Sequence, residues 1–120
     1  MRNDLDKIII CDLLTRGPIG ISEEERSRPQ DILINVTLYA DTRRAAQSDS
    51  IEDCVNYSTV AGKIIKLAEG NKRKTVEAFA QDIADLCLDY SQVQRVLVRV
   101  EKTSAVRFTK SVGVEIEREK

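Results

Sequence analysis

Residues 30–41 read QDILINVTLYAD, and this stretch indicates most plainly how the chain folds. The even-numbered positions from 32 to 40 are all apolar, whereas Asn35 and Thr37 interrupt the odd-numbered ones. Because side chains alternate between the two faces of a strand, this period of two predicts a strand over Gln30–Asp41 with its even-numbered side chains in a core. The opposite face also carries Leu33, and we expect it to be covered in part.

Three further segments have the composition of strands. Lys7–Leu14 contains three consecutive isoleucines, and Val93–Glu101 alternates valine with other residues toward its end. In segment 112–117, apolar residues alternate with glycine or glutamate. Because β-branched residues pack well on a pleated sheet, each segment predicts a strand. Lys102 directly follows the third of these strands and continues its valine face.

Two helices are predicted between the second and third strands. Ser58 can cap a helix of about eleven residues, which Gly70 ends as a C′ residue. Thr75 can cap a second helix, in which apolar residues recur at helical spacing. The polar segment 22–29 indicates a loop with at most one helical turn, and segment 42–53 is charged and shows no clean period.

The order β-β-α-α-β-β predicts one α+β domain over residues 1–120, an antiparallel four-stranded sheet with two helices on one face. Such a sheet has two open edges, and open edges promote pairing with other chains. Joining several such sheets into a ring would remove the edges. The pattern therefore favours an oligomeric barrel.

Composition excludes several classes of function. Lys and Arg number 19 against 20 Asp and Glu, so we expect no nucleic-acid binding. No apolar stretch approaches the ~20 residues of a membrane span, and we expect no membrane partner. Histidine is absent, which excludes histidine zinc sites and Ser-His-Asp triads and leaves Lys, Glu, Asp or Tyr as the general base.

The three cysteines, at positions 11, 54 and 87, form no C-x-x-C pair and lie among apolar neighbours. We expect all three to be buried, reduced thiols. Reduced thiols indicate a reducing compartment, and the expected location is the cytoplasm.

Four polar residues fall where the pattern does not require them. Glu25 lies in the loop before the second strand, and Tyr57 lies just ahead of the first helix. Glu77 opens the second helix, and Lys102 ends the third strand. Each has an ordinary structural alternative: a solvated loop carboxylate, a staple residue, a carboxylate favoured by a helix N-terminus, and a lysine that extends from a sheet edge to solvent.

The motifs that surround these four residues resemble those of a known family. The motifs are Ile19-Gly20-Ile21 with Glu25-Arg26 and Pro29-Gln30; Ser48-Asp49 with Val55-Asn56-Tyr57; Thr75-Val76-Glu77 with Ala80 and Ile83-Ala84; and Val100-Glu101-Lys102 with Ala105-Val106-Arg107-Phe108 and Ser111 to Ile116. In order and spacing they resemble the dihydroneopterin aldolase family, over nearly the whole chain. The resemblance implies the tunnelling fold, in which β-β-α-α-β-β subunits form ring-shaped tetramers. Two rings stack into an octamer with active sites between subunits.

The resemblance also implies a reaction. The family cleaves 7,8-dihydroneopterin by a retro-aldol step into 6-hydroxymethyl-7,8-dihydropterin and glycolaldehyde. Because the pterin ring accepts the electrons, neither a cofactor nor a metal is implied. Glu77 matches the residue that anchors the pterin through paired hydrogen bonds, with further contacts from the Val76 backbone. Lys102 matches the catalytic general acid–base. Tyr57, from the adjacent subunit, matches the catalytic tyrosine that helps handle the side-chain hydroxyl and the proton that forms the product. Glu25 matches the loop glutamate that contacts the hydroxylated tail and water.

Two alternatives remain open at this stage. An epimerase of dihydroneopterin or its triphosphate would use the same intermediate, and a ring protein without activity would only bind the pterin. Thr103 stands where the family often has proline after the lysine, so the lysine is held less rigidly. Arg16 has no matched role, and contact with a substrate phosphate is one candidate.

Overall fold

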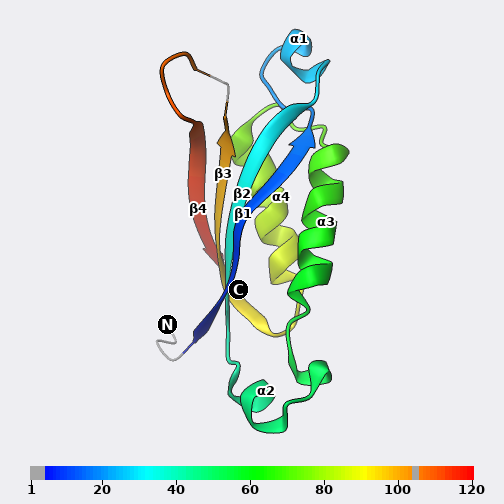
Figure 1. Cartoon of the computed structure of the whole chain (residues 1–120), viewed down its shortest axis with the longest axis vertical. Helices are drawn as coiled ribbons and strands as arrows, with labels where there is room; N and C mark the ends of the chain where they lie inside the picture. The colour runs from blue at the N-terminus through cyan, green and yellow to red at the C-terminus, as the bar shows by residue number, and fades with distance from the viewer. Residues whose placement is uncertain (1–4, 104–105) are drawn as a thin grey trace.

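A computed structural model describes residues 5–103 and 106–120. Its four-stranded antiparallel sheet has the order β1-β2-β3-β4, so neighbours in sequence are neighbours in the sheet (Figure 1). The strands are β1 (Asp6–Gly17), β2 (Gln30–Ala40), β3 (Val93–Lys102) and β4 (Val112–Glu119). The other elements are α1 (Glu23–Arg26), α2 (Arg43–Ser48), the 3₁₀ helix η1 (Ile51–Asp53), α3 (Tyr57–Glu69) and α4 (Val76–Leu88). The predicted fold class is confirmed, and the helical turn in segment 22–29 is α1.

Helices α3 and α4 cover one face of the sheet, and the core lies between these two layers (Figure 1). The even-numbered side chains of β2 from 32 to 40 are at most 1% exposed, which confirms the period of two. Val96, Val98 and Val100 of β3 extend the same apolar surface toward α4. Burying side chains of this size stabilises a fold by about 1.5–3 kcal/mol each, so this layer fixes the orientation of the whole sheet.

The caps of the two long helices differ in how well they were predicted. Thr75 caps α4 as expected, since its hydroxyl accepts a hydrogen bond from the N–H of Ala78 at 3.1 Å. The prediction that Ser58 caps α3 is wrong. Asn56 does so through its side-chain oxygen, because asparagine two residues earlier offers an equally good acceptor. Gly70 ends α3 at the C-cap itself and not at C′, with φ of −98°.

Strand β1 runs to Gly17, beyond the predicted end at Leu14. Its register against β2 shifts between Ile10 and Leu13, and Asp12 there has φ of +52°. Such a bulge adds a residue and reverses the alternation of faces. Odd-numbered side chains after the bulge, such as that of Thr15, therefore turn toward the helices.

Segment 42–53, in which no period was found, contains α2 and η1. Neither element has a buried residue, so no apolar stripe could indicate them in the sequence. The prediction of three buried cysteines holds only for Cys87, since Cys11 and Cys54 are exposed. Cys11 lies at the β1 bulge and Cys54 directly after η1, where the chain departs from regular structure. Of the family motifs, Ala105 lies outside the described residues.

Candidate active site

Lys102 is the last residue of β3 and lies at the end of its valine face, as predicted. Its side chain is only 13% exposed, and its Nζ lies 3.3 Å from Oε2 of Glu25. The two residues are 77 positions apart in sequence, so the fold brings them together. A half-buried ammonium held against a carboxylate can take and return protons at a fixed position.

Glu25 is held in place by its own loop. It lies in α1, and the Ser22 hydroxyl that caps this helix accepts a hydrogen bond from the Glu25 N–H at 3.1 Å. Gly20 has φ of +152°, and a Cβ there would lie 2.4 Å from Cβ of Glu25 and 2.9 Å from its Oε2. Only glycine therefore leaves room for the carboxylate at this position. Beside it lies a hollow of about 270 Å³, lined by Ser22, Glu24, Glu25, Arg28 and Gln30.

Glu77 is the second residue of α4, and its side chain is exposed. Helix α4 begins at the same end of the sheet as Lys102, since the connection before it is bonded to Pro18, next to the end of β1. In the described residues no hydrogen bond or ion pair engages the Glu77 carboxylate. The N–H of Val76, the first residue of α4, has no partner within the helix. Carboxylate and N–H together can bind a flat amidine-like edge.

Tyr57 lies at the other end of the subunit. It is the first residue of α3, is 61% exposed, and borders a hollow of about 180 Å³ beside Ala40. Lys102 pairs with Ile32, and from Ile32 to Ala40 strand β2 rises about 27 Å at ~3.4 Å per residue. Tyr57 and Lys102 of one chain therefore lie at opposite ends of the subunit. The fold brings Glu25 and Lys102 together, sets Glu77 near them and leaves Tyr57 apart.

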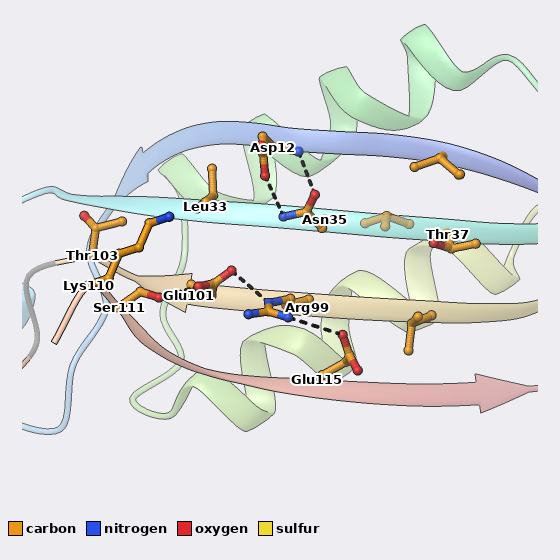
Figure 2. A pocket seen from close by; sticks show the side chains of 13 residues that line it. Asp12, Leu33, Asn35, Thr37, Arg99, Glu101, Thr103, Lys110, Ser111 and Glu115 are labelled. Carbon is orange, nitrogen blue, oxygen red and sulfur yellow. Dashed lines mark hydrogen bonds and ion pairs between the residues drawn. The ribbon is translucent and has the colours of Figure 1, made fainter.

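Another hollow, of about 550 Å³, lies on the sheet face that the helices leave open (Figure 2). None of the predicted site residues lines it. Arg99 lies there between Glu101 and Glu115, at 2.9 and 3.9 Å. The Ser111 hydroxyl, which donates to Glu101, and the Arg99 guanidinium lower the pKa of the Glu101 carboxyl. Glu101 thus points away from its neighbour Lys102, and its carboxylate is engaged by Ser111 and Arg99.

Sequence reasoning missed the residues that shape the loop before β2. Arg26 donates from Nη1 to the carbonyls of Gly20 and Ile21, both at 2.8 Å. Gln30 donates to the carbonyls of Ile19 and Glu25. Both residues were part of the quoted family motifs, and their spacing around Glu25 is the signal that could have identified them. Arg16 pairs with Asp31 at 2.7 Å on the surface, so its guanidinium is already engaged.

Residues 5–103 and 106–120 contain neither a candidate metal cluster nor a membrane-spanning helix. No group of three or more Cys, Asp or Glu side chains there could hold a metal ion. No helix in those ranges is long and apolar enough to cross a membrane.

Comparisons with known proteins agree with this geometry. The Dictyostelium discoideum folic acid synthesis protein FOL1 is 40% identical over 95% of this chain, which spans 17% of that protein's length. The Escherichia coli dihydroneopterin triphosphate 2′-epimerase is 37% identical over 89% of both chains. The crystal structure of Escherichia coli dihydroneopterin aldolase in complex with neopterin matches with a TM-score of 0.89 and 31% identity, over 94% of this chain and 98% of that one.

The family model described as dihydroneopterin aldolase (FolB) matches residues 8–117, nearly the whole chain. The two covering helices and the quoted motifs lie within that range, as does the sheet apart from the first two residues of β1 and the last two of β4. The chain belongs to the dihydroneopterin aldolase family.

Proposed function

We propose that this protein is a dihydroneopterin aldolase, which cleaves 7,8-dihydroneopterin into 6-hydroxymethyl-7,8-dihydropterin and glycolaldehyde. The observation that carries the proposal is the Lys102–Glu25 pair, 3.3 Å apart at the end of β3. The family membership and the similarity to an aldolase crystallised with neopterin support a pterin substrate.

In the proposed reaction the pterin ring accepts the electrons of the broken bond. A base removes the proton from the hydroxyl on the second side-chain carbon, and the bond between the first two side-chain carbons breaks. The electron pair moves into the C=N bond of the ring, and glycolaldehyde leaves. A proton then returns to the first side-chain carbon, which gives the hydroxymethyl product. Lys102 is the proposed acid–base for these transfers, and Glu25 holds the tail hydroxyls.

The ring is anchored at α4 in this proposal. The Glu77 carboxylate accepts two parallel hydrogen bonds, from the amino group and the ring N–H of the pterin. It lies in the first turn of a helix, where the helix dipole favours its charged form. The Val76 N–H supplies a further contact. The exposed position of Glu77 leaves this edge accessible to a ligand.

We propose that Tyr57 reaches the site from a second subunit. Within one chain it lies roughly 27 Å along the sheet from Lys102, by the rise of β2. Strands β1 and β4 are the edges of the sheet and are open to pairing with neighbouring copies. The proposed assembly is a tetrameric ring, two of which stack into an octamer. The proposed location is the cytoplasm, since a reducing compartment keeps the three free thiols reduced.

A second candidate activity is epimerisation. It is favoured by the 37% identity to a dihydroneopterin triphosphate epimerase, above the 31% to the Escherichia coli aldolase. Both reactions would share the cleaved intermediate, and only recombination of the fragments after rotation would invert the hydroxyl-bearing carbon.

The test is incubation of metal-stripped protein with 7,8-dihydroneopterin, followed by chromatography of the products. Formation of 6-hydroxymethyl-7,8-dihydropterin that Lys102→Ala abolishes would support the aldolase. Dihydromonapterin with little cleavage would establish the epimerase instead. If neither the free nor the triphosphate substrate turns over while the pterin still binds, the protein is a binding protein and the proposal fails.

A further inference from the structure

Four consecutive backbone carbonyls, from Pro18 to Ile21, each accept a hydrogen bond from a side chain. Asn71 Nδ2 donates to Pro18 O at 2.8 Å, Gln30 donates to Ile19 O, and Arg26 donates to Gly20 O and Ile21 O. Carbonyls in surface connections are commonly left to water. Here their partners are fixed groups of the protein, so the path of the chain that leads to Glu25 is tightly specified.

Asn71 differs from the other two donors. Arg26 lies in the loop that it closes and Gln30 directly follows it as the first residue of β2, whereas Asn71 lies 53 residues from Pro18, in the connection between α3 and α4. It is one of two buried polar residues among those described, with 8% of its surface exposed. A buried carboxamide must find partners for its polar atoms, and their identity decides what it joins.

The carboxamide of Asn71 is fully engaged. Besides Pro18 O, its Nδ2 donates to Arg73 O at 3.1 Å, and its Oδ1 accepts from Arg73 N at 3.0 Å. The Arg73 guanidinium in turn bonds both carboxylate oxygens of Asp82 on α4, at 2.9 and 3.0 Å. Asn71 is thus tied on one side to the helix that carries Glu77 and on the other to the segment that leads to Glu25.

The segments around Asn71 are closely packed against one another. Its N–H donates to Ala68 O at 3.2 Å, near the end of α3. A Cβ at Gly17 would lie 1.9 Å from that same carbonyl oxygen, so the end of β1 touches the end of α3 there. A shift in one of these segments is therefore passed on to the others, because a close-packed contact cannot absorb it.

We propose that Asn71 is a positioning residue, which sets the place of the Glu25–Lys102 pair relative to the pterin anchor Glu77. This inference rests on the proposed function. Asn71 does not touch the reacting atoms. It acts by fixing Pro18, from which the chain runs through Gly20 to Glu25. A displacement of about 1 Å at a reacting group is enough to lower a rate by on the order of a hundredfold.

The test uses Asn71→Asp, which is nearly isosteric, keeps the acceptor for Arg73 N and removes the donor to Pro18 O. Asn71→Ser, which keeps a shorter acceptor, is the second variant in case the charge of Asp prevents folding. The control is Ile83→Val, which removes one buried methylene from the middle of α4 and leaves every hydrogen bond of segment 18–26 in place.

Three readouts separate positioning from plain stability. They are kcat for dihydroneopterin cleavage, the affinity for 7,8-dihydropterin, which lacks the tail, and hydrogen exchange of the amides of residues 19–26. In the Asn71 variants kcat should fall by on the order of ten- to a hundredfold, while ring affinity changes by less than about threefold. Exchange should be faster in residues 19–26, and Ile83→Val should change none of the three.

Unchanged kcat in a folded Asn71 variant would overturn the inference. So would an equal loss in Ile83→Val, since the effect would then follow stability alone. If the wild type cleaves no substrate, the proposed function fails. Exchange then decides about Asn71 by itself: faster exchange of residues 19–26 supports the tie to Pro18, and unchanged exchange overturns it.

Discussion

The two ends of the subunit hold their functional side chains in different ways. At one end Lys102 is 13% exposed and paired with Glu25, whose loop is closed by side-chain hydrogen bonds. At the other end Tyr57 is 61% exposed at the start of α3. The first end is organised before any ligand binds, whereas the second offers an aromatic side chain to a partner. The difference supports the proposal that the site is assembled from two chains, each contributing a different end.

Replacing the lysine tests the organised end most severely. Lys102→Ala should lower kcat by on the order of a hundred- to ten-thousandfold, because the proton transfers lose their acid–base. Affinity for the tail-free ring should stay near the wild-type value, since Glu77 is the proposed anchor of the ring. Single-turnover kinetics and ring titration measure the two effects. A comparable loss of ring affinity would place Lys102 in binding and not in proton transfer.

Mixing two inactive proteins tests whether the two ends meet across subunits. Tyr57→Ala and Lys102→Ala should each be nearly inactive alone. Refolded together, they should regain up to about a quarter of wild-type activity, because a random assembly unites the intact Tyr57 of one chain with the intact Lys102 of another. Refolding each variant by itself is the control. No recovery in verified mixed oligomers would mean that the tyrosine serves its own chain.

Glu77→Gln should act on binding more than on chemistry. The amide keeps the size of the side chain but loses the charge and one of two acceptors, so KM should rise by roughly ten- to a hundredfold. The change in kcat should be smaller. Initial-rate kinetics give both constants, and Glu115→Gln, on the open face of the sheet, is the matched control. A fall in kcat at unchanged KM would contradict the anchor role.

Gly20→Ala and Gly62→Ala form a matched pair that probes the Glu25 loop. A Cβ at Gly20 would lie 2.4 Å from that of Glu25, in a backbone conformation with φ of +152°. We expect a loss of about 1–3 kcal/mol in stability and of roughly tenfold in kcat. Nothing lies within 4 Å of a Cβ at Gly62, in the interior of α3. Alanine there should stabilise the helix by about 0.5–1 kcal/mol. Denaturant titration and kcat measure both variants, and an undisturbed Gly20→Ala would refute the packing argument.

Sequence periodicity correctly predicted the strands that bury one face against the helices. The even-numbered residues of β2 and the valines of β3 meet one helix layer, so their pattern is nearly unbroken. It failed for α2, because that helix buries none of its residues. It also missed the bulge at Asp12, whose backbone N–H donates to Asn35 Oδ1 of β2 and whose carboxylate accepts from Asn35 Nδ2. A break in the alternation of β1 side chains can be assigned to a bulge only when the partner strand is known.

The residues of the candidate site were identified from the family resemblance and not from periodicity. Periodicity places Lys102 at a strand end, and the family resemblance put it in one site with Glu25, but their contact across 77 residues was not predicted. Asn71 escaped notice because it stands in the basic stretch 71–74, which looks like an ordinary solvated turn. Its burial depends on the close approach of Gly17 to Ala68, a tertiary contact that no local pattern encodes.

The smallest effect is expected in the core between the two ends, at Cys87. Burial raises the pKa of its thiol from 9.0 to about 12. Between these values the unfolded chain releases a proton that the native chain keeps, so the native state loses up to ~1.4 kcal/mol of stability per pH unit. Below pH 9 this stability is fully present.

Cys87→Ala removes the titrating group at a cost of roughly 1 kcal/mol at pH 8. The stability advantage of the wild type over the variant should therefore fall with rising pH, pass through zero at roughly pH 10 and reverse sign by pH 10.5, while every other titration cancels between them. Urea unfolding at stepped pH measures it, and Cys11→Ala, at an exposed thiol, should give a constant difference. A constant difference for Cys87→Ala as well would mean that water reaches the core between sheet and helices.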